Sequence, residues 1–489
     1  MSENYLEPQL VNTGNATTTT PISQAILEGY APGNELYTFT ELPTITTEEL
    51  VNLQNASYAE IFYQVTKKLL GSALPDEVLR ATADEVYGLD NFDFDPEDKN
   101  LRFTTLPSGI EIVGLSDGPT GAFKDMAMQP FARWMNYLQA QNNKPLNILL
   151  STSGDTGPAA LHAFGGLPNT EVTAMLPKRG VSTFQWAQMA ELSDPEHGTH
   201  ALEVEGSFSD INDLHMQADL VYALGAVNSV NVARIVAQVP YHVASYLKAI
   251  DRNGGKIGDP VDICVPSGNF GNALAAIIAR KMGVPIRNIM VATNENNTLD
   301  TLFREHVFKL SEFQHTDSSA QDVRMPSNAW RYLAMLYSND TAKIQQTYAE
   351  LTASGGANID TIGIADPSLI DGMYSVTVTA PERRATIQKV YSETSGRIVI
   401  DPHTANAVIG AEKLRELTAD QPPAPIVAYE TAKPFKFAAL VEEIIGVAPA
   451  RPERFVGLEE RQAGKTLPQI ADITELLDYL TANTSAQKK

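Results

Sequence analysis

The chain is organised around the segment SDGPTGAFKD at residues 116–125, which delivers one lysine to the start of a helix. Glycine and proline make the segment a turn, and from Met126 to Leu138 apolar residues recur at helical spacing. An ammonium at a helix start meets the positive end of the helix dipole, which lowers its pKa. Such a lysine can act as an amine nucleophile. Taken alone, Lys124 could equally be an ordinary exposed lysine after a tight turn.

Composition narrows the class of protein. A length of 489 residues predicts two or three domains, and 43% apolar residues supply ample core. A net charge of −23 excludes nucleic acid and anionic membranes as partners. The single cysteine, Cys264, excludes an intramolecular disulfide and fits a reducing compartment. With no signal peptide and no membrane-length apolar run, we expect a cytoplasmic protein.

Strands and helices alternate from Leu101 onward, after a first hundred residues of short helices and turns. Repeated strand–turn–helix units predict an open, largely parallel α/β sheet. The expected strands cover residues 110–115, 147–150, 171–176, 201–204, 261–265, 288–293, 398–400 and 426–429.

Two strand-to-helix turns are rich in small and hydrogen-bonding residues. Residues 267–272 place two glycines at a helix N-terminus, which makes an anion cradle or simply a tight turn. The turn matches neither a Walker loop nor the dinucleotide fingerprint, so a phosphate on another kind of molecule is favoured. Residues 151–157 offer hydroxyls for a carboxylate or phosphate, or a helix cap. Asp155 in this turn predicts a cationic or protonated neighbour.

A third candidate spans residues 228–238, where Asn231, Arg234 and Gln238 share one helical face. An arginine beside amides can clamp an anion, although an ion-paired surface arginine would give the same spacing. No metal site is expected, because His197 and His200 lack a third ligand nearby. A lysine at a helix start, a phosphate cradle and no metal together suggest pyridoxal phosphate, which needs a lysine for its aldehyde and a cradle for its phosphate.

These residues resemble the threonine synthase family, in the longer form found in fungi and many bacteria. The resemblance runs nearly the whole chain. Its motifs are GPTGAFKD (118–125), TSGDTG (152–157), NSVNVARIVAQ (228–238) and PSGNFGN (266–272), with TPISQAI (20–26), DPHTA (401–405) and TAKPFKF (431–437) toward the two ends.

The resemblance implies a fold, a division of the chain and a reaction. The fold is pyridoxal-phosphate fold type II, the tryptophan synthase β-like architecture, with two open α/β domains and an N-terminal domain. Residues 1–100 would form the N-terminal domain, 101–125 with 231–489 the large cofactor-binding domain, and 126–230 a small mobile domain. The reaction is the lyase-type conversion of O-phospho-L-homoserine and water to L-threonine and phosphate. The protein would be a monomer or weak dimer.

The resemblance also implies roles for single residues. Lys124 would be the catalytic residue and form a Schiff base with the cofactor. The cofactor phosphate would be held by Gly268, Asn269, Phe270, Gly271 and Asn272, and the pyridine nitrogen would face Thr431. Substrate binding would fall to Ser151, Thr152, Ser153, Asp155 and Thr156 and to Asn228, Ser229, Asn231 and Arg234.

The sequence departs from the family at three places. Residues 33–36 replace an expected Asp-Gly-Gly-Leu turn, Lys433 stands where a histidine is usual, and residues 317–327 match only in part. The last two could touch the rim of the site. Two other readings stay open: a dehydratase or phospho-lyase of the same fold, and a catalytically idle relative with a binding role.

Overall fold

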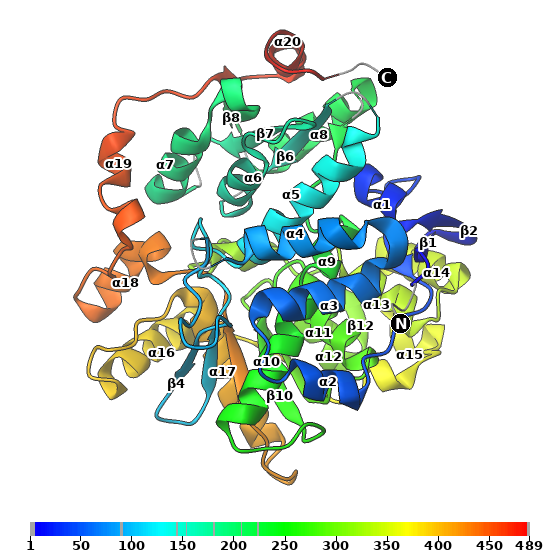
Figure 1. Cartoon of the computed structure of the whole chain (residues 1–489), viewed down its shortest axis with the longest axis vertical. Helices are drawn as coiled ribbons and strands as arrows, with labels where there is room; N and C mark the ends of the chain where they lie inside the picture. The colour runs from blue at the N-terminus through cyan, green and yellow to red at the C-terminus, as the bar shows by residue number, and fades with distance from the viewer. Residues whose placement is uncertain are drawn as a thin grey trace.

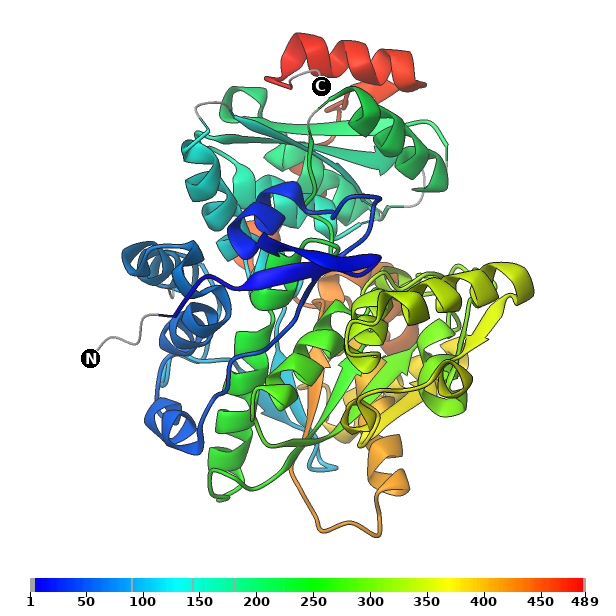
Figure 2. The ribbon, with the colours of Figure 1, turned by 90° about the vertical axis from the view of Figure 1, so that its right-hand side faces the viewer.

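The computed structural model describes residues 5–88, 91–142, 145–152, 154–178, 181–206, 208–222 and 224–486. Two open β-sheets, each with helices on both faces, lie at opposite ends of the long axis of the molecule (Figure 1). Turned by 90°, the N-terminal segment is seen packed against both parts (Figure 2). Within these ranges, no helix has the length and apolar character needed to cross a membrane.

Six strands form the larger sheet. In spatial order they are β14 (Met373–Thr377), β11 (Ile286–Thr293), β10 (Val261–Pro266), β15 (Ile426–Glu430), β5 (Glu111–Gly114) and β4 (Phe103–Thr105). All neighbours pair parallel except β4 and β5, which are antiparallel. The carboxyl ends of the parallel strands therefore meet at one edge, where ligands bind in open α/β sheets.

Helices bury both faces of the larger sheet, which explains the near-continuous apolar runs of its strands. One face packs on α10 (Val239–Arg252) and α11 (Gly271–Lys281), and the other on α16 (Ala380–Glu393) and α17 (Pro402–Leu417). Alternate side chains of β10 accordingly enter different clusters: Ile263 and Val265 join the first, and Cys264 joins the second.

The smaller sheet has five parallel strands. In spatial order they are β16 (Gln469–Ile470), β8 (Thr199–Val204), β7 (Thr170–Pro177), β6 (Leu146–Ser151) and β9 (Leu224–Gly225). One face is covered by α5 (Asp125–Ala140), α6 (Thr156–Phe164) and α7 (Thr183–Leu192), and the other by α8 (Phe208–Val221) and α20 (Ile473–Asn483).

The first hundred residues brace the rest. A three-stranded antiparallel sheet carries β2 (Asn15–Pro21), β1 (Gln9–Asn12) and β3 (Tyr37–Phe39), and the helices are α1 (Ile22–Glu28), α2 (Thr47–Leu53), α3 (Tyr58–Leu70) and α4 (Asp76–Val86). Helix α3 packs on α10 and α4 on α5, so this part contacts the helices of both sheets. Phe62 stacks on the buried Trp134 of α5 with ring centroids 5.8 Å apart.

The remaining elements lie around the larger sheet or in the C-terminal segment. Helices are α9 (Val232–Val236), α12 (Thr298–Glu305), α13 (Ala329–Leu336), α14 (Thr341–Ser354), α15 (Ile359–Ile362), α18 (Ala438–Ile445) and α19 (Leu458–Arg461); β12 (Val307–Lys309) pairs with β13 (Gly356–Asn358). Short 3-10 turns are η1 (Gly71–Ala73), η2 (Pro195–His197), η3 (Ser319–Gln321), η4 (Pro367–Leu369), η5 (Pro434–Phe437) and η6 (Glu453–Phe455).

The predicted alternation of strands and helices is confirmed, but β4, β9, β12, β13, β14 and β16 were not predicted and one predicted strand is absent. Residues 398–400 are not a strand: Ile398 and Ile400 pack in the α16–α17 cluster, and the chain then caps α17 at Asp401. Residues 398–400 are apolar because they are buried, although they do not pair with a strand. Strand β14 was missed because, at the sheet edge, its residues after Met373 are only half-buried and carry no apolar run.

The C-terminal segment differs from the expected division. Residues 231–489 were assigned to the large domain, but the chain crosses from α18 and α19 to the smaller sheet, where β16 pairs with β8 and α20 packs on α8 (Figure 1). Leu476 and Leu480 of α20 are fully buried there. The tail thus completes a hydrophobic face begun about 300 residues earlier, which no local pattern reveals. The other domain boundaries stay a prediction.

Replacing Leu476 by alanine should destabilise the smaller sheet, because a buried leucine is lost and a cavity remains. We expect a cost of about 2–5 kcal/mol in the free energy of unfolding, measured by urea denaturation with the intrinsic protein signal. Leu417→Ala, at a side chain that is 48% exposed, is the matched control and should cost less than about 0.5 kcal/mol. Equal effects for the two variants would contradict the docking of α20.

Candidate active site

The lysine turn is held by its own carboxylate and by a distant segment. Thr120 donates its backbone N–H and its hydroxyl to the Asp125 carboxylate, at 2.8 and 2.9 Å. Phe123 N–H donates to Thr431 O at 2.9 Å, and Lys433 N–H donates to Gly121 O at 3.1 Å. These two bonds join the turn after β5 to the segment after β15, so Thr431 lies beside the turn that carries Lys124.

Lys124 is enclosed and lies among charged groups of both signs. Its side chain is 15% exposed, and its Nζ lies 3.9 Å from Asp155 Oδ2. Burial lowers the pKa of Lys124, and the charges of Arg234 and Lys436 lower it further, whereas Asp155 raises it. The direction agrees with the lowered lysine pKa that the sequence predicted, although burial rather than the helix dipole is the main cause.

Asp155 lies between two lysines. Its Oδ1 is 2.9 Å from Lys436 Nζ and accepts a hydrogen bond of 2.9 Å from Gln185 Nε2. Burial alone would raise the pKa of Asp155, but the charges of Lys436 and Lys124 outweigh burial and hold that pKa well below its usual range. The prediction that Asp155 faces a cationic group is confirmed.

Lys436 was not singled out as a functional residue in the sequence. Its side chain is fully buried, and it also donates to Thr120 O at 3.0 Å and to Gln188 Oε1 at 3.1 Å. The only signal available was its place in the TAKPFKF motif at 431–437. Gln185 and Gln188 of α7 were also not predicted as site residues, because their hydrogen-bond partners come from other parts of the chain.

The glycine cradle begins where β10 ends. Phe270 adopts a left-handed conformation, with φ 65°, and α11 starts at the next residue. In the described part of the chain, Ser267 Oγ and both side-chain atoms of Asn272 are buried without a hydrogen-bond partner. Buried polar atoms normally have partners, so these groups are suited to a ligand. The Phe270 ring packs on Phe303 at 5.5 Å, so only its backbone can serve the cradle.

A neighbouring loop closes tightly over Gly268. A Cβ built on Gly268 would lie 3.0 Å from both Ala320 O and the Gln321 Cα, so the position needs glycine. Gln321 donates from Nε2 to Ser267 O at 3.2 Å, and Ala320 N–H donates to His403 Nε2 at 3.1 Å. His403, in the DPHTA motif at 401–405, therefore supports the loop that closes over Gly268.

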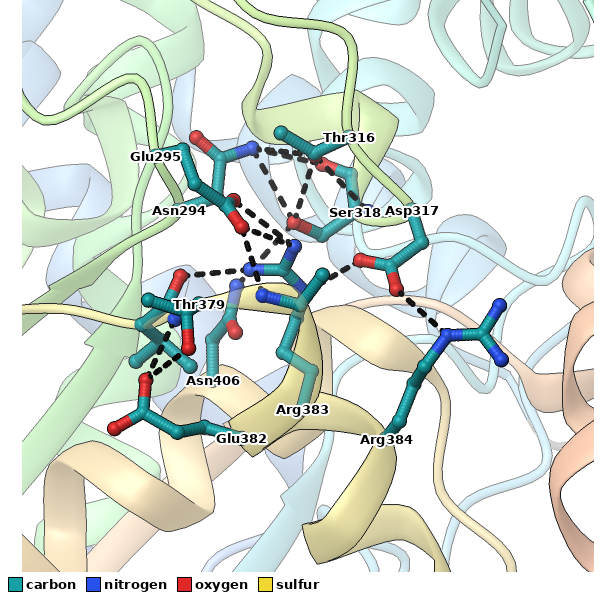
Figure 3. A network of polar contacts seen from close by, with 12 residues as sticks. Asn294, Glu295, Thr316, Asp317, Ser318, Thr379, Glu382, Arg383, Arg384 and Asn406 are labelled. Atoms are coloured by element: carbon teal, nitrogen blue, oxygen red, sulfur yellow. Dashed lines mark hydrogen bonds and ion pairs between the residues drawn. The ribbon is translucent and has the colours of Figure 1, made fainter.

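The departing segment 317–327 is fixed by a polar network (Figure 3). The fully buried Arg383 contacts Asp317 at 2.5 Å and Glu295 at 2.9 Å. Asn294 donates to Thr316 at 2.9 Å, and Asn406 donates to Gln321 at 2.6 Å. Asp317 is thus engaged by an arginine of α16, and the network braces the loop over Gly268.

Lys433 pairs with carboxylates beside the lysine turn. Its Nζ lies 2.5 Å from Asp117 and forms a further ion pair with Glu430. This pairing gives the lysine a structural role beside the turn.

The segment 228–238 combines a structural and a free polar group. Asn231 donates both amide hydrogens to Ile26 O and Ala226 O, each at 2.9 Å, and its Oδ1 caps α9, so the amide is fully used within the protein. Arg234 donates to Val227 O at 3.0 Å, but its Nε has no partner among the described residues. Burial lowers the pKa of Arg234 to about 10. Arg234 therefore keeps an unused donor for an anion.

The turn at 151–157 also contains one hydroxyl that is bonded within the turn and one that has no partner among the described residues. Thr152 Oγ1 accepts the backbone N–H groups of Gly154 and Gly157, at 3.1 and 3.0 Å, and so shapes the turn. Ser151 Oγ is buried with no partner in the described ranges, and Thr156 begins α6. Ser153, also predicted to bind substrate, lies outside the described residues. Asn228 and Ser229 are half-buried, and Asn269 is exposed.

A buried lysine after β5 and a glycine cradle after β10, at the same edge of the larger of two open α/β sheets, define a pyridoxal-phosphate enzyme of fold type II. Solved structures agree. A pyridoxal-phosphate-bound threonine synthase from Brucella melitensis is 29% identical, with TM-score 0.85 over 98% of this chain and 99% of that chain. Yeast threonine synthase is 27% identical, with TM-score 0.86 over 98% and 99%. This confirms the fold class.

Sequence relatives give the same family. Threonine synthase of Corynebacterium glutamicum is 35% identical over 95% of this chain and 97% of its own length, and that of Methylobacillus glycogenes is 33% identical over 93% and 94%. Family models for the threonine synthase N terminus and the threonine synthase C-terminal part match residues 9–87 and 404–477. The chain belongs to the threonine synthase family. It is a pyridoxal-phosphate-dependent lyase, as the sequence predicted.

The residues present fit pyridoxal phosphate. The cofactor needs a primary amine, a phosphate cradle and an enclosed space. Lys124 supplies an amine that burial favours in its neutral form, and residues 267–272 supply unpartnered donors at a helix start. His242 supports the cradle from behind: Tyr429 Oη lies 2.8 Å from its Nδ1, and its Nε2 lies 3.0 Å from Asn272 O.

Gly268→Ala should weaken cofactor retention. The added methyl group would press on backbone atoms of residues 320 and 321, so the cradle must move away from the phosphate. We expect the dissociation constant of pyridoxal phosphate, measured by equilibrium dialysis, to rise at least about tenfold, which is about 1.4 kcal/mol. Gly356→Ala is the control, because its nearest neighbour would lie at 3.4 Å, an ordinary contact. Retention unchanged in Gly268→Ala would refute this cradle.

His242 should make the protein sensitive to acid. Burial lowers its pKa from 6.5 to about 3, so the unfolded chain binds a proton that the folded chain excludes. Stability from this group is present above pH 6.5 and is lost as the pH falls toward 3, by up to about 1.4 kcal/mol per pH unit. His242→Gln should flatten that part of the curve of unfolding free energy against pH, measured in urea. An unchanged slope would mean that His242 is charged in the folded protein.

Proposed function

We propose that this chain converts O-phospho-L-homoserine and water into L-threonine and phosphate, the last step of threonine biosynthesis. The observation that carries the proposal is the enclosed amine of Lys124, near the buried cations Arg234 and Lys436 and at the same sheet edge as a cradle with unpartnered polar atoms. These groups lie in four of the motifs that resemble threonine synthase, and the relatives named threonine synthase extend over most of the chain. We further propose that the protein works in the cytoplasm as a monomer or weak dimer.

The charges around Lys124 suit a substrate with two anionic groups. Arg234 and Lys436 are buried cations whose fields reach Lys124, and Asp155 is the ionised carboxylate beside them. A buried cation with an unused donor, such as Arg234, can bind a phosphate ester locally although the whole chain carries −23. We assign Arg234 to the substrate phosphate and Ser151 with the start of α6 to the substrate carboxylate.

Lys124 is the proton carrier in this proposal. When bound, pyridoxal phosphate links to an amine through its aldehyde and withdraws electrons from the carbon next to the substrate nitrogen. The neutral Nζ of Lys124 takes the proton from that carbon and returns it at the end of the cycle. The β carbon also loses a proton and phosphate leaves the γ carbon, which takes up a proton to become the methyl group. Water then adds its hydroxyl at the β carbon, and Asp155 balances the positive charge that develops on Nζ.

The cradle and Thr431 hold and orient the cofactor. The backbone of residues 268–271 and the Asn272 amide would bind its phosphate, and Ser267 Oγ is a further donor that the sequence-based assignment left out. Thr431, which is 6% exposed beside the lysine turn, would present its hydroxyl to the ring nitrogen. A hydroxyl partner, unlike a carboxylate, leaves that nitrogen without a full proton.

Lys124→Ala should abolish both the covalent link and turnover. We expect a loss of at least about 10³-fold in turnover, because a proton carrier is removed, and no cofactor fixed to the chain after borohydride reduction. Lys413→Ala, at a side chain that is 48% exposed, should keep both. A fully active Lys124→Ala variant with trapped cofactor would sink the assignment.

Measuring the products of turnover separates the proposed reaction from the other activities of this fold. Phosphate release with equal threonine formation supports the proposed reaction. Phosphate release with formation of a 2-oxo acid, or turnover of threonine or serine instead, would assign the chain to a phospho-lyase or dehydratase. Binding of cofactor and substrate with no turnover would indicate an idle relative.

A further inference from the structure

Lys436 is the buried cation of the site whose purpose the proposed reaction does not explain. Its side chain has no exposed surface, and its ammonium has three acceptors: Asp155 Oδ1 at 2.9 Å, Thr120 O at 3.0 Å and Gln188 Oε1 at 3.1 Å. An ammonium has three donors, so all of them are used within the protein. Such a group is held too firmly to follow a substrate, which points to a role through its partners.

The three hydrogen-bond and ion-pair partners of Lys436 come from three separate segments of the chain. Asp155 follows β6 and Gln188 lies on α7, so both belong to the smaller sheet; Thr120 belongs to the lysine turn. Lys436 itself lies in η5, after the last strand of the larger sheet. Phe435 anchors η5 by packing on Phe184 of α7, with ring centroids 5.3 Å apart. One ammonium therefore joins both sheets at the point where Lys124 emerges.

We propose that Lys436 is a positioning residue, whose ammonium fixes the Asp155 carboxylate beside the Lys124 amine and offsets its charge. The proposal rests on the proposed role of Lys124. A substrate-binding role for Asp155 becomes secondary, because Oδ1 is already taken by Lys436 and Gln185 and only Oδ2 faces Lys124.

Charge balance explains why two lysines share one carboxylate. A lone buried carboxylate 3.9 Å from an amine would hold that amine protonated, because opposite charges attract strongly in a poorly solvated site. A second ammonium on the other carboxylate oxygen keeps Asp155 ionised and weakens its hold on the proton of Lys124. The charged groups that face Lys124 are Asp155 from the loop after β6, Arg234 from α9, Lys436 from η5 and Asp125 from α5.

The sign of the effect distinguishes this role from simple structural support. Removing the positive charge of Lys436 should raise the pKa of the Lys124 nitrogen, while removing the negative charge of Asp155 should lower it. General loosening of the site would move both variants in the same direction, toward ordinary lysine behaviour. Opposite shifts from two residues in contact with each other are therefore diagnostic.

The experiment is a pH titration of the holoenzyme, followed by the visible absorbance of the lysine-bound cofactor. For Lys436→Gln, which keeps amide donors near Thr120 O and Gln188, we expect the apparent pKa to rise by about one unit or more. Asp155→Asn should shift the apparent pKa downward, and Lys436→Arg should restore most of the wild-type value. The pH optimum of kcat should move upward in Lys436→Gln, with KM changed less than kcat.

Lys433→Met is the matched control. Lys433 lies three residues away, is half-buried, and forms ion pairs with Asp117 and Glu430 that the substitution removes, whereas the Asp155 ion pairs of the described residues involve Lys124 and Lys436. It should lower the thermal midpoint, measured by circular dichroism, and leave the titration of Lys124 unchanged. An equal pKa shift in Lys433→Met, or no shift or a downward shift in Lys436→Gln, would overturn the proposal.

A second measurement separates failure of this proposal from failure of the proposed function. In the full-length chain freed of cofactor, the pH dependence of acetic anhydride labelling at Lys124, read by peptide mass spectrometry, reports the same amine directly. The same upward shift in Lys436→Gln supports the proposal, and an unshifted profile overturns it. If borohydride fixes no cofactor to Lys124 in the wild-type chain, the proposed function itself fails.

Discussion

Two backbone hydrogen bonds, from Phe123 to Thr431 and from Lys433 to Gly121, are the constraint on which the site depends. They fasten the turn after β5 to the segment after β15, which is its neighbour in the sheet but lies about 300 residues away in the chain. Once this contact is made, Lys124, Thr431 and Lys436 lie on one side of the molecule, and Asp155 can reach them from the smaller sheet.

The protein keeps several charges away from water at this junction, which is costly unless each charge has a partner. Asp155 is shared by two lysines, Lys433 is shared by Asp117 and Glu430, and Arg383 is held by Asp317 and Glu295. Among the described residues, Arg234 Nε is buried without a partner, and its guanidinium donates to a backbone carbonyl.

Sequence patterns predicted the fold class and most strands, because the strands of a doubly covered sheet are apolar along their whole length. The prediction failed for residues 398–400, where burial occurs without pairing, and for β14, where an edge strand is half-buried. Of the site, the turn with Lys124 and the glycine cradle could be found because turns rich in glycine and polar residues between a strand and a helix are visible in the local sequence. The hydrogen bonds from Asn231 to Ile26 and Ala226 could not be inferred, because helical spacing does not reveal partners elsewhere in the chain.

The sequence by itself determined the chemistry of this protein: a lysine at a helix start, a cradle of glycines and amides, and an alternation that folds into parallel sheets. These features depend on neighbours in the chain, so they can be read locally. Only the tertiary structure decided which charges meet. The pairing of Asp155 with Lys436, the support of the cradle by His403 and the docking of α20 on the smaller sheet all join residues far apart in the chain. Their geometry exists only after both sheets have formed and packed together.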